Sequence, residues 1–459
     1  MTQQVDEENI HLRLCHCRYS LTGWESISLK EWKNSPYRKP LILSGARQVG
    51  KTWLMKEFGR TEYTNTVYVN FDQDINAAGL FEGSINPDRI ILGLRALSGM
   101  EIDPDNTLII FDEVQEAPRA LTSLKYFCEE APQYSIIAAG SLLGVALHAG
   151  TSFPVGKVDR MHLYPLNFQE FLYAMGEDAV AEILQTKDQR MITVLREKLS
   201  DLLRQYYYVG GMPETVNYYK DNKEFAGVRQ IQKNLLVYYQ QDFSKHAEPR
   251  LTERLNLVWS SIPAQLAKEN RKFIYGQVRQ GARAKDFELA IQWLSDCGLI
   301  HVIHRVTKPG YPLKAYEDLN AFKIYLLDVG LLGAMADLSS NTIVEGNRIF
   351  TEFKGALSEQ YVLQELIAED HLNPMYYSAE NSRMEIDFIV QKGDEVIPIE
   401  VKAEENLRAK SLRTYCEKYK PKTAVRFSMS DYREQDWMVN VPLYEINWLI
   451  EQGKDSEVK

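Results

Sequence analysis

The chain has 459 residues, more than one hydrophobic core ordinarily holds, so we expect two or three domains. Hydrophobic residues make up 45% of the sequence and charged residues 25%, as in a globular protein with full cores. No apolar run reaches membrane-spanning length, and a net charge of −10 excludes a uniformly positive surface, although a local basic patch can still bind nucleic acid.

Residues 1–30 are predicted to be an N-terminal extension. They lack a basic region followed by an apolar one, so we expect no secretory signal. Five scattered cysteines fit reduced thiols better than a disulfide framework. Cys15 and Cys17 flank His16, but no second Cys/His pair follows at zinc-finger spacing, so we expect ordinary side chains. Together these features predict a cytoplasmic protein without a membrane attachment.

A phosphate-binding pattern follows the first predicted strand, residues 41–43. The glycines of this pattern let several backbone N–H groups point at one anion, and the helix predicted over 53–58 adds its positive N-terminal end. Lys51 would contact the β- and γ-phosphates of ATP, and the Thr52 hydroxyl would hold Mg²⁺. The predicted nucleotide-binding residues are Gly45, Ala46, Arg47, Gln48, Val49, Gly50, Lys51, Thr52 and Trp53.

Two further strands are predicted to end in polar residues. The strand over 108–111 leads to Asp112, which would hold Mg²⁺ through water, and to Glu113, which would polarise the attacking water. The strand over 135–139 leads to Ser141, which on spacing alone is either a sensor of the γ-phosphate or an ordinary turn residue.

Strands alternate with helices through residues 31–175. This alternation predicts an α/β domain with a parallel sheet and helices on both of its faces. Ligands bind at the carboxyl ends of the strands in such domains, which is where the three motifs fall.

These motifs resemble those of bacterial and archaeal AAA-type ATP-binding proteins that carry a large uncharacterised C-terminal region. The matching stretches are residues 45–52, 108–118, 138–147, 163–172, 206–216, 322–335 and 384–402. The resemblance implies an Mg²⁺-dependent ATPase in which Ser141 is the sensor. AAA-type sites often borrow an arginine from a neighbouring subunit, so the resemblance also implies a homo-oligomer.

The sequence departs from this family just before residues 163–172. The family has Gly-Arg there, whereas this chain has Gly156-Lys157, with Arg160 three residues later. Lysine stabilises transition-state charge less well than the planar fork of arginine. Three alternatives stay open: Arg160 is the arginine finger, the finger lies elsewhere, or hydrolysis is slow.

Residues 176–250 are predicted to form a helical lid or connector. Clustered tyrosines at 206–208 and 238–239 could stack on nucleic-acid bases, but packing of the helices is the more common use of such side chains, and we expect it here.

Residues 251–340 are predicted to form a winged-helix-like domain. An amphipathic helix over 285–297 precedes two alternating segments, 299–306 and 322–327, that read as a hairpin. Basic residues precede the helix or lie on the hairpin: Arg271, Lys272, Arg279, Arg283, Lys285, His304, Arg305, Lys308 and Lys314. They indicate either contacts with a DNA backbone or the solvated surface of a structural spacer, and both interpretations stay open.

Residues 350–451 are predicted to form an α/β domain, with 452–459 as a tail. The expected elements are a helix over 351–368, strands over 375–378, 384–391 and 396–402, a helix over 407–418, and strands over 423–427 and 441–444. This order, with Asp387 on the second strand and Glu400 and Lys402 on the third, resembles the PD-(D/E)xK nucleases of restriction-endonuclease type.

The residue types of this domain suit phosphodiester hydrolysis. Asp387 and Glu400 are expected to converge on one Mg²⁺ or Mn²⁺ ion, with Glu359 from the helix completing the metal site. Lys402 would orient the attacking water or stabilise charge on the phosphate. The competing interpretation is a salt-bridge cluster on a solvated sheet face, and we favour the metal site.

The whole sequence therefore predicts a Mg²⁺-dependent AAA-type ATPase coupled to a nuclease-like domain that acts on DNA. The alternative is a nucleotide-switched regulatory or interaction protein whose nuclease-like domain is an inert scaffold.

Overall fold

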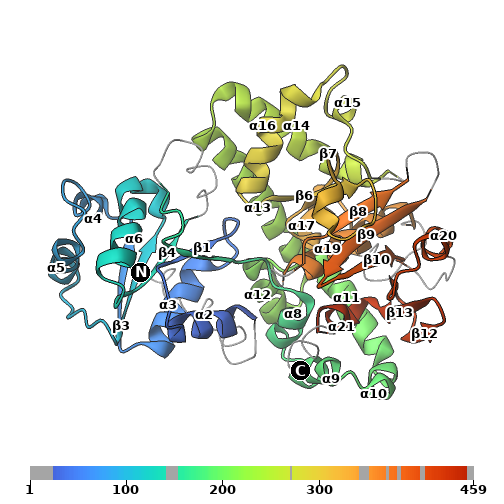
Figure 1. The fold of residues 1–459 in the computed structure, drawn as a ribbon, viewed down its shortest axis with the longest axis horizontal. Helices are drawn as coiled ribbons and strands as arrows, with labels where there is room; N and C mark the ends of the chain where they lie inside the picture. The colour runs from blue at the N-terminus through green and yellow to red at the C-terminus, as the bar shows by residue number, and fades with distance from the viewer. Residues whose placement is uncertain are drawn as a thin grey trace. The chain divides into compact units, whose positions relative to one another are not determined.

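The structure is a computed structural model of the whole chain. It describes residues 24–140, 153–268, 271–340, 351–368, 372–379, 384–403 and 409–451. The chain divides into two compact units: unit 1 is Met1–Tyr164 with Asp296–Leu299, and unit 2 is Pro165–Ser295 with Ile300–Lys459 (Figure 1). Among the described helices, none is both long and apolar enough to cross a membrane.

Unit 1 is built on a five-stranded parallel sheet. Its strands are β1 (Leu41–Ser44), β2 (Asn65–Asn70), β3 (Thr107–Asp112), β4 (Ser135–Ala139) and β5 (Asp159–His162). The sequence predicts the parallel sheet and three of its strands, and β2 and β5 are additional. They lie in the order β2-β3-β4-β1-β5. Every residue of β3 and β4 is buried, which is why these strands read as continuous apolar runs.

The helices of unit 1 cover both faces of this sheet. They are α2 (Trp24–Asn34), α3 (Lys51–Glu62), α4 (Ile75–Gly79), α5 (Pro87–Ser98) and α6 (Pro118–Glu130). Helices α4, α5 and α6 share one buried cluster with Ile109 and Phe111 of β3. Helix α3 contacts β2, β3 and β4, but its buried Leu54 and Phe58 lie outside that cluster, so α3 covers the opposite face. The helix after the phosphate loop begins at Lys51, two residues earlier than the sequence predicts.

The first part of unit 2 is helical. Its helices are α8 (Phe168–Ala174), α9 (Asp178–Thr186), α10 (Gln189–Val194), α11 (Arg196–Val209), α12 (Pro213–Asn222), α13 (Phe225–His246), α14 (Pro249–Leu266), α15 (Tyr275–Val278), α16 (Ala284–Asp296) and α17 (Val329–Met335). Of the clustered tyrosines, Tyr206, Tyr207, Tyr208 and Tyr239 are buried and pack the helices as expected, whereas Tyr238 is 46% exposed.

The second part of unit 2 is an eight-stranded mixed sheet. Its strands are β6 (Ile300–Val306), β7 (Glu317–Leu326), β8 (Met375–Ser378), β9 (Glu385–Lys392), β10 (Glu395–Val401), β11 (Val425–Ser428), β12 (Arg433–Gln435) and β13 (Met438–Pro442). They lie in the order β12-β13-β11-β10-β9-β8-β6-β7. Because β6 pairs in parallel with β8, the hairpin of the predicted winged helix and the strands of the predicted nuclease-like domain form one sheet.

Helices also cover both faces of this second sheet. The helices are α19 (Thr351–Ile367), α20 (Lys410–Tyr419) and α21 (Asn447–Glu451). Leu412 and Tyr415 of α20 share a buried cluster with Ile386 of β9. Helix α19 contacts β10, and its buried Leu363 is not part of that cluster, which indicates that α19 covers the other face. Helices α19 and α20 and the β9–β10 hairpin follow the predicted order.

Two of the stretches that carry the family resemblance meet inside unit 2. The backbone N–H of Gly211 donates to Asp328 Oδ2 at 2.6 Å, and the N–H of Leu331 donates to Oδ1 at 2.9 Å. A Cβ atom at Gly210 would lie 2.2 Å from Asp328 Oδ1, and φ there is +72°, so only glycine fits. Burial raises the pKa of Asp328 to about 6, although the backbone donors oppose this shift. These motifs therefore build the core of unit 2.

Candidate functional site

The loop between β1 and α3 has the backbone of a phosphate cradle. Gly45, Gln48 and Gly50 adopt positive φ angles of 143°, 66° and 99°. A Cβ atom at Gly45 would lie 2.4 Å from the carbonyl oxygen of Leu163, so a larger residue does not fit. The loop runs directly into the first turn of α3, whose N–H groups have no acceptors within the helix and attract an anion.

Lys51 opens α3 and is only 7% exposed. Its Nζ donates hydrogen bonds to the carbonyl oxygens of Gly45 at 2.8 Å and Ala46 at 2.7 Å, so the side chain lies folded over the loop. Burial lowers the pKa of Lys51 to about 8, although the carboxylates of Glu113 and Asp112 oppose this shift. A phosphate oxygen would be a stronger partner for this ammonium group than a loop carbonyl.

Asp112 ends β3 and accepts three hydrogen bonds. Thr52 Oγ1 donates to Oδ2 at 2.7 Å, and the Tyr68 hydroxyl donates to the same oxygen at 2.9 Å. The backbone N–H of Glu113 donates to Oδ1 at 3.0 Å. All three donors are neutral groups, so the negative charge of Asp112 is solvated without an ion pair. A hydroxyl and a carboxylate side by side are oxygen ligands that suit Mg²⁺.

Glu113, the predicted residue for water activation, follows directly in a left-handed conformation with φ +49°. Its Oε2 accepts a hydrogen bond from Gln115 Nε2 at 2.5 Å. The carboxylates of Asp112 and Glu113 are close enough to Lys51 to interact with its charge, so the three side chains lie near one another. The predicted sensor, Ser141, lies outside the described residues.

The two basic residues considered for the arginine finger have other partners. Lys157 Nζ lies 2.9 Å from Glu129 Oε1 in an ion pair at the surface. The guanidinium of Arg160 lies over the Phe153 ring, 4.3 Å from its centre. Neither contact involves the phosphate loop.

His162 flanks the site but belongs to no motif used in the sequence analysis. It ends β5 opposite Ser44, the residue before the loop, and its Nδ1 lies 3.2 Å from Ser44 Oγ. Burial, and secondly the charge of Lys51, lowers the pKa of His162 to about 4, so the ring is neutral near pH 7. Only the pairing of β5 with β1 brings His162 here, and that pairing leaves no local sequence signal.

The predicted metal ligands of unit 2 do come together from three elements. Glu359 lies on α19, Asp387 on β9 and Glu400 on β10, and Asp387 interacts electrostatically with both glutamates. Asp387 Oδ2 also accepts a hydrogen bond from the backbone N–H of Val401 at 2.8 Å. The convergence expected from the strand order is therefore present.

Two of these three carboxylates already have cationic partners. Glu359, 3% exposed, forms an ion pair with Arg271 and accepts a hydrogen bond from the Tyr325 hydroxyl at 3.1 Å. Glu400, 5% exposed, lies 2.7 Å from Lys402 Nζ. Burial raises the pKa of Glu359 to about 7 against the opposing charge of Arg271, and burial likewise raises the pKa of Glu400 against Lys402.

The surroundings of Arg271 accommodate its guanidinium. A Cβ atom at Gly355 would lie 2.8 Å from Arg271 Nη2, so this glycine leaves room for the ion pair. Within the described ranges, no three His, Cys, Asp or Glu side chains are grouped so that they could hold a metal ion. As placed, Glu359, Asp387 and Glu400 therefore do not fit a metal, because cations of the fold already pair with Glu359 and Glu400.

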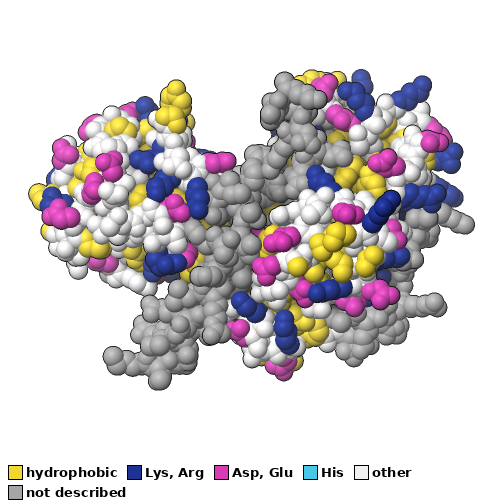
Figure 2. Space-filling model, turned by 90° about the horizontal axis from the view of Figure 1, so that it is seen from below, with side chains coloured by type: hydrophobic (Ala, Val, Ile, Leu, Met, Phe, Trp, Pro, Cys, Tyr) yellow, Lys and Arg dark blue, Asp and Glu magenta, His cyan; other side chains and the backbone are white. Residues whose placement is uncertain are grey.

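The predicted DNA-contacting residues are largely paired as well. Arg305 lies 2.7 Å from Asp318, and His304 and Lys314 both pair with Glu317 at 2.9 Å and 2.6 Å. On the face drawn in Figure 2, Lys and Arg side chains are interspersed with Asp and Glu. These pairs occupy the charges expected to meet a DNA backbone, so contact with DNA stays a prediction.

Family models match three parts of the chain. Residues 37–172 match the model of an AAA domain. This part of the chain is an AAA domain. Residues 200–342 match a domain of unknown function (DUF8612), and residues 354–446 match another (DUF4143).

Two solved structures are similar to parts of the chain. The Walker-type ATPase PABY2304 of Pyrococcus abyssi is 14% identical, with 68% of this chain and 94% of that chain covered and a TM-score of 0.41. Protein VC1899 from Vibrio cholerae is 11% identical, with 90% and 98% covered and a TM-score of 0.18. A comparison with curated proteins gave no match.

The AAA domain offers suitable groups for Mg²⁺ and ATP. The loop at Gly45 has no room for a side chain, and the buried Lys51 ammonium is bonded only to loop carbonyls in the contacts described above. The Thr52 hydroxyl and the Asp112 carboxylate provide hard oxygen ligands at 2.7 Å from each other. The residues present therefore fit a metal–triphosphate complex.

Proposed function

We propose that the chain is a Mg²⁺-dependent ATPase whose AAA domain binds and hydrolyses ATP. The observation that carries this proposal is the 2.7 Å contact between Thr52 Oγ1 and Asp112 Oδ2. Thr52 directly follows the buried Lys51 in the sequence. The contact joins the start of α3 to the end of β3, so a cation for the phosphates and oxygen ligands for Mg²⁺ lie at the same edge of the sheet.

Each residue of this site has a separate role in the proposal. Lys51 binds the β- and γ-phosphates, Thr52 contacts the ion directly, and Asp112 contacts it through water. Glu113 polarises the attacking water, and Ser141 senses the γ-phosphate. Bound Mg²⁺ neutralises phosphate charge.

The proposal is tested by steady-state ATP turnover of Lys51→Ala. We expect a loss of about 100-fold or more, because the substitution removes the positive charge that stabilises the transferred phosphate. Lys125→Ala, on an exposed position of α6, is the matched control and should leave turnover unchanged. Turnover that is the same in both variants would contradict the assignment.

For unit 2 the geometry favours a nuclease-like scaffold in a nucleotide-switched interaction protein. The observation behind this second candidate function is the pair of buried contacts, Glu359 with Arg271 and Glu400 with Lys402. A metal ion at this position would have to compete with two cations that are already part of the fold. The competing function, cleavage of DNA by Asp387, Glu400 and Lys402, needs those pairs to open.

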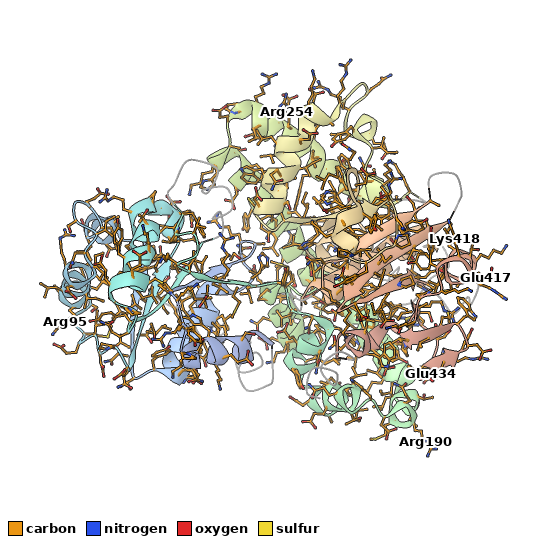
Figure 3. The ribbon with its side chains drawn as sticks, in the orientation of Figure 1. Arg95, Arg190, Arg254, Glu417, Lys418 and Glu434 are labelled. Carbon is orange, nitrogen blue, oxygen red and sulfur yellow. The ribbon has the colours of Figure 1, made fainter. Side chains whose placement is uncertain are left out.

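Cleavage assays separate the two functions of unit 2. Plasmid and branched DNA are incubated with Mg²⁺ or Mn²⁺ and one of four proteins: wild type, Asp387→Ala, Lys402→Ala or Lys418→Ala. Lys418→Ala is the control, because Lys418 lies on α20 and its side chain points outward from the helix (Figure 3). The scaffold predicts no difference among the four proteins. Cleavage that is lost in the first two variants and retained in the control would establish a metal-dependent nuclease instead.

DNA and a second copy of the chain remain proposed partners. DNA that stimulates ATP turnover would support a nucleic-acid function, whereas nucleotide-dependent binding of a protein, with no response to DNA, would support the interaction function. A mass measured in solution with and without ATP tests whether the chain assembles into an oligomer that shares an arginine between subunits.

A further inference from the structure

Tyr68 contacts the AAA site although no phosphate-binding motif contains it. Strand β2 lies next to β3 with Asn70 opposite Asp112, so Tyr68 and Asn70 are two residues apart on the same face of one strand. The Tyr68 hydroxyl donates to Asp112 Oδ2 at 2.9 Å, and Asn70 Nδ2 donates to the Tyr68 oxygen at 3.2 Å. A chain of hydrogen bonds thus runs along the strand edge to the carboxylate.

Lys56 approaches the same tyrosine from α3. Its Nζ lies 3.9 Å from the centre of the Tyr68 ring, in a cation–π contact. Thr52 and Lys56 are four residues apart on α3 and therefore lie on one face of the helix. A cation over the ring withdraws electron density from the phenol and makes its hydroxyl a better donor.

The hydroxyl of Tyr68 acts as a donor toward Asp112. A phenol carries its proton near neutral pH, so the Tyr68 O–H is the donor and the carboxylate oxygen is the acceptor. Asp112 is 2% exposed, and Oδ2 accepts from Thr52 as well as from Tyr68. When the Thr52 oxygen turns toward a metal, the Tyr68 hydroxyl is the side-chain donor that still fixes this carboxylate oxygen.

We propose that Tyr68 is a positioning residue for the metal: it orients Asp112 for Mg²⁺, and Asn70 and Lys56 hold Tyr68 in place. This inference rests on the proposed binding of Mg²⁺ and ATP by the AAA domain. It adds a second layer of contacts that sets the affinity for the ion, and it does not place Tyr68 in contact with the reacting phosphate.

The test compares Tyr68→Phe with wild type by electron paramagnetic resonance of Mn²⁺ in the presence of a non-hydrolysable ATP analogue. We expect Mn²⁺ to bind about tenfold more weakly, because loss of a contact that orients a metal ligand costs about 10- to 100-fold in affinity. The Mg²⁺ concentration that half-saturates ATP turnover should rise by the same factor, with kcat at saturating Mg²⁺ close to that of wild type. Tyr134→Phe is the matched control and should change neither quantity, because Tyr134 precedes the amino end of β4, away from the carboxyl ends of the strands where the site lies.

Two further variants keep the test decisive if Tyr68→Phe fails to fold. Lys56→Met removes the cation over the Tyr68 ring, and Asn70→Ala removes the donor to the Tyr68 oxygen together with two turn contacts, from the backbone N–H groups of Asp72 and Gln73 to Asn70 Oδ1. Each should weaken Mn²⁺ binding in the same direction by about two- to threefold, as expected for loss of one weak contact to Tyr68. Mn²⁺ affinities equal to that of wild type in all folded variants would overturn the proposal.

The result also separates this inference from the proposed ATPase. Weaker Mn²⁺ binding in Tyr68→Phe, with no turnover in wild type, would support the positioning role and remove the proposed hydrolysis. ATP turnover by wild type, together with unchanged Mn²⁺ affinity in the variants, would support the proposed hydrolysis and remove the positioning role of Tyr68. Absence of Mn²⁺ binding to wild type with the ATP analogue would overturn both.

Discussion

Asp112 in the AAA domain and Glu359 in unit 2 are both carboxylates with at most 3% of their surface exposed, yet they have different kinds of partner. Asp112 accepts from the hydroxyls of Thr52 and Tyr68, whereas Glu359 forms an ion pair with Arg271. A buried negative charge must be balanced or protonated. Neutral donors leave that charge available to an external cation, whereas an arginine inside the fold already pairs with it.

The acidic residues beside these two carboxylates have different contacts as well. Glu113 accepts a hydrogen bond from Gln115 and interacts with the Lys51 ammonium, while Glu400 lies 2.7 Å from Lys402 Nζ. Converging carboxylates therefore do not by themselves establish a metal site, because the charges of their neighbours decide whether an ion is needed. The predictions below test this difference, beginning with the largest expected effect.

Glu113→Gln should lower kcat for ATP by about a thousandfold, because the amide cannot take the proton of the attacking water. Glu116→Gln is the matched control, because Glu116 is exposed at the end of the short 3-10 helix Val114–Glu116 that follows Glu113. Glu400→Gln should leave ATP turnover unchanged, because its carboxylate belongs to unit 2. A comparable loss in Glu400→Gln would show that the two acidic sites are not separate, and retained activity in Glu113→Gln would remove its role.

Arg271→Met should destabilise unit 2 by about 3 kcal/mol, since it leaves Glu359 buried without its cation. Urea unfolding gives the free energy of unfolding. Arg279→Met is the control, because Arg279 is 67% exposed and its ion pair with Glu253 is long, at 3.8 Å, and therefore weak. Arg271→Met combined with Glu359→Gln should recover most of the loss, since the uncompensated charge is then gone. A double variant as unstable as Arg271→Met would mean that packing, not charge, explains the cost.

The stability of the two units should depend on pH with opposite signs between pH 6.5 and about 5. The pKa of His162 falls from 6.5 to about 4 on folding, so the unfolded chain binds more protons in this range and unit 1 loses about 2 kcal/mol as the pH drops. The pKa of Glu359 rises from 4.5 to about 7, so the folded state binds more protons and unit 2 gains a similar amount.

Hydrogen exchange resolved by peptide measures both slopes separately, after correction for the intrinsic effect of pH. His162→Gln should flatten the slope of unit 1. Glu359→Gln should reduce the slope of unit 2 without removing it, because burial also raises the pKa of Asp328 to about 6 and that of Glu445 to about 7. Parallel slopes in the two units would contradict the contrast between the two sites.

Lys157→Ala should change ATP turnover by no more than about twofold, because its ammonium pairs with Glu129 at the surface and exposed pairs contribute little. Turnover assays of Lys157→Ala and Arg160→Ala side by side provide the measurement. A loss of about a thousandfold in either variant would identify that residue as the finger.

Local patterns predicted individual elements closely. The strand Ser135–Ala139 occurs as expected, the helix predicted over 351–368 is Thr351–Ile367, and the helix predicted over 285–297 is Ala284–Asp296. These elements depend on the spacing of apolar residues along a few turns or pleats, which a sequence displays directly. The strand predicted over 322–327 begins earlier, at Glu317, because its exposed first half lacks apolar alternation.

Contacts between distant segments were harder to predict. The sequence indicated that Asp387, Glu400 and Lys402 share one place, but it gave no sign that Arg271, more than a hundred residues earlier, lies beside Glu359. Likewise, none of the predicted motifs or strands includes Tyr68. Its importance depends on β2 being the neighbour of β3.

The sequence by itself determined the AAA phosphate loop, the acidic strand end that follows it, and the bounds of several helices and strands in each unit, because these depend on residues close together in the chain. Only the tertiary structure decided which charges meet: two hydroxyls at Asp112, an arginine at Glu359 and a neutral histidine beside Ser44. The physical reason is that the free energy of a buried charge depends on all the groups around it, and strand order brings those groups from parts of the chain that no local pattern connects.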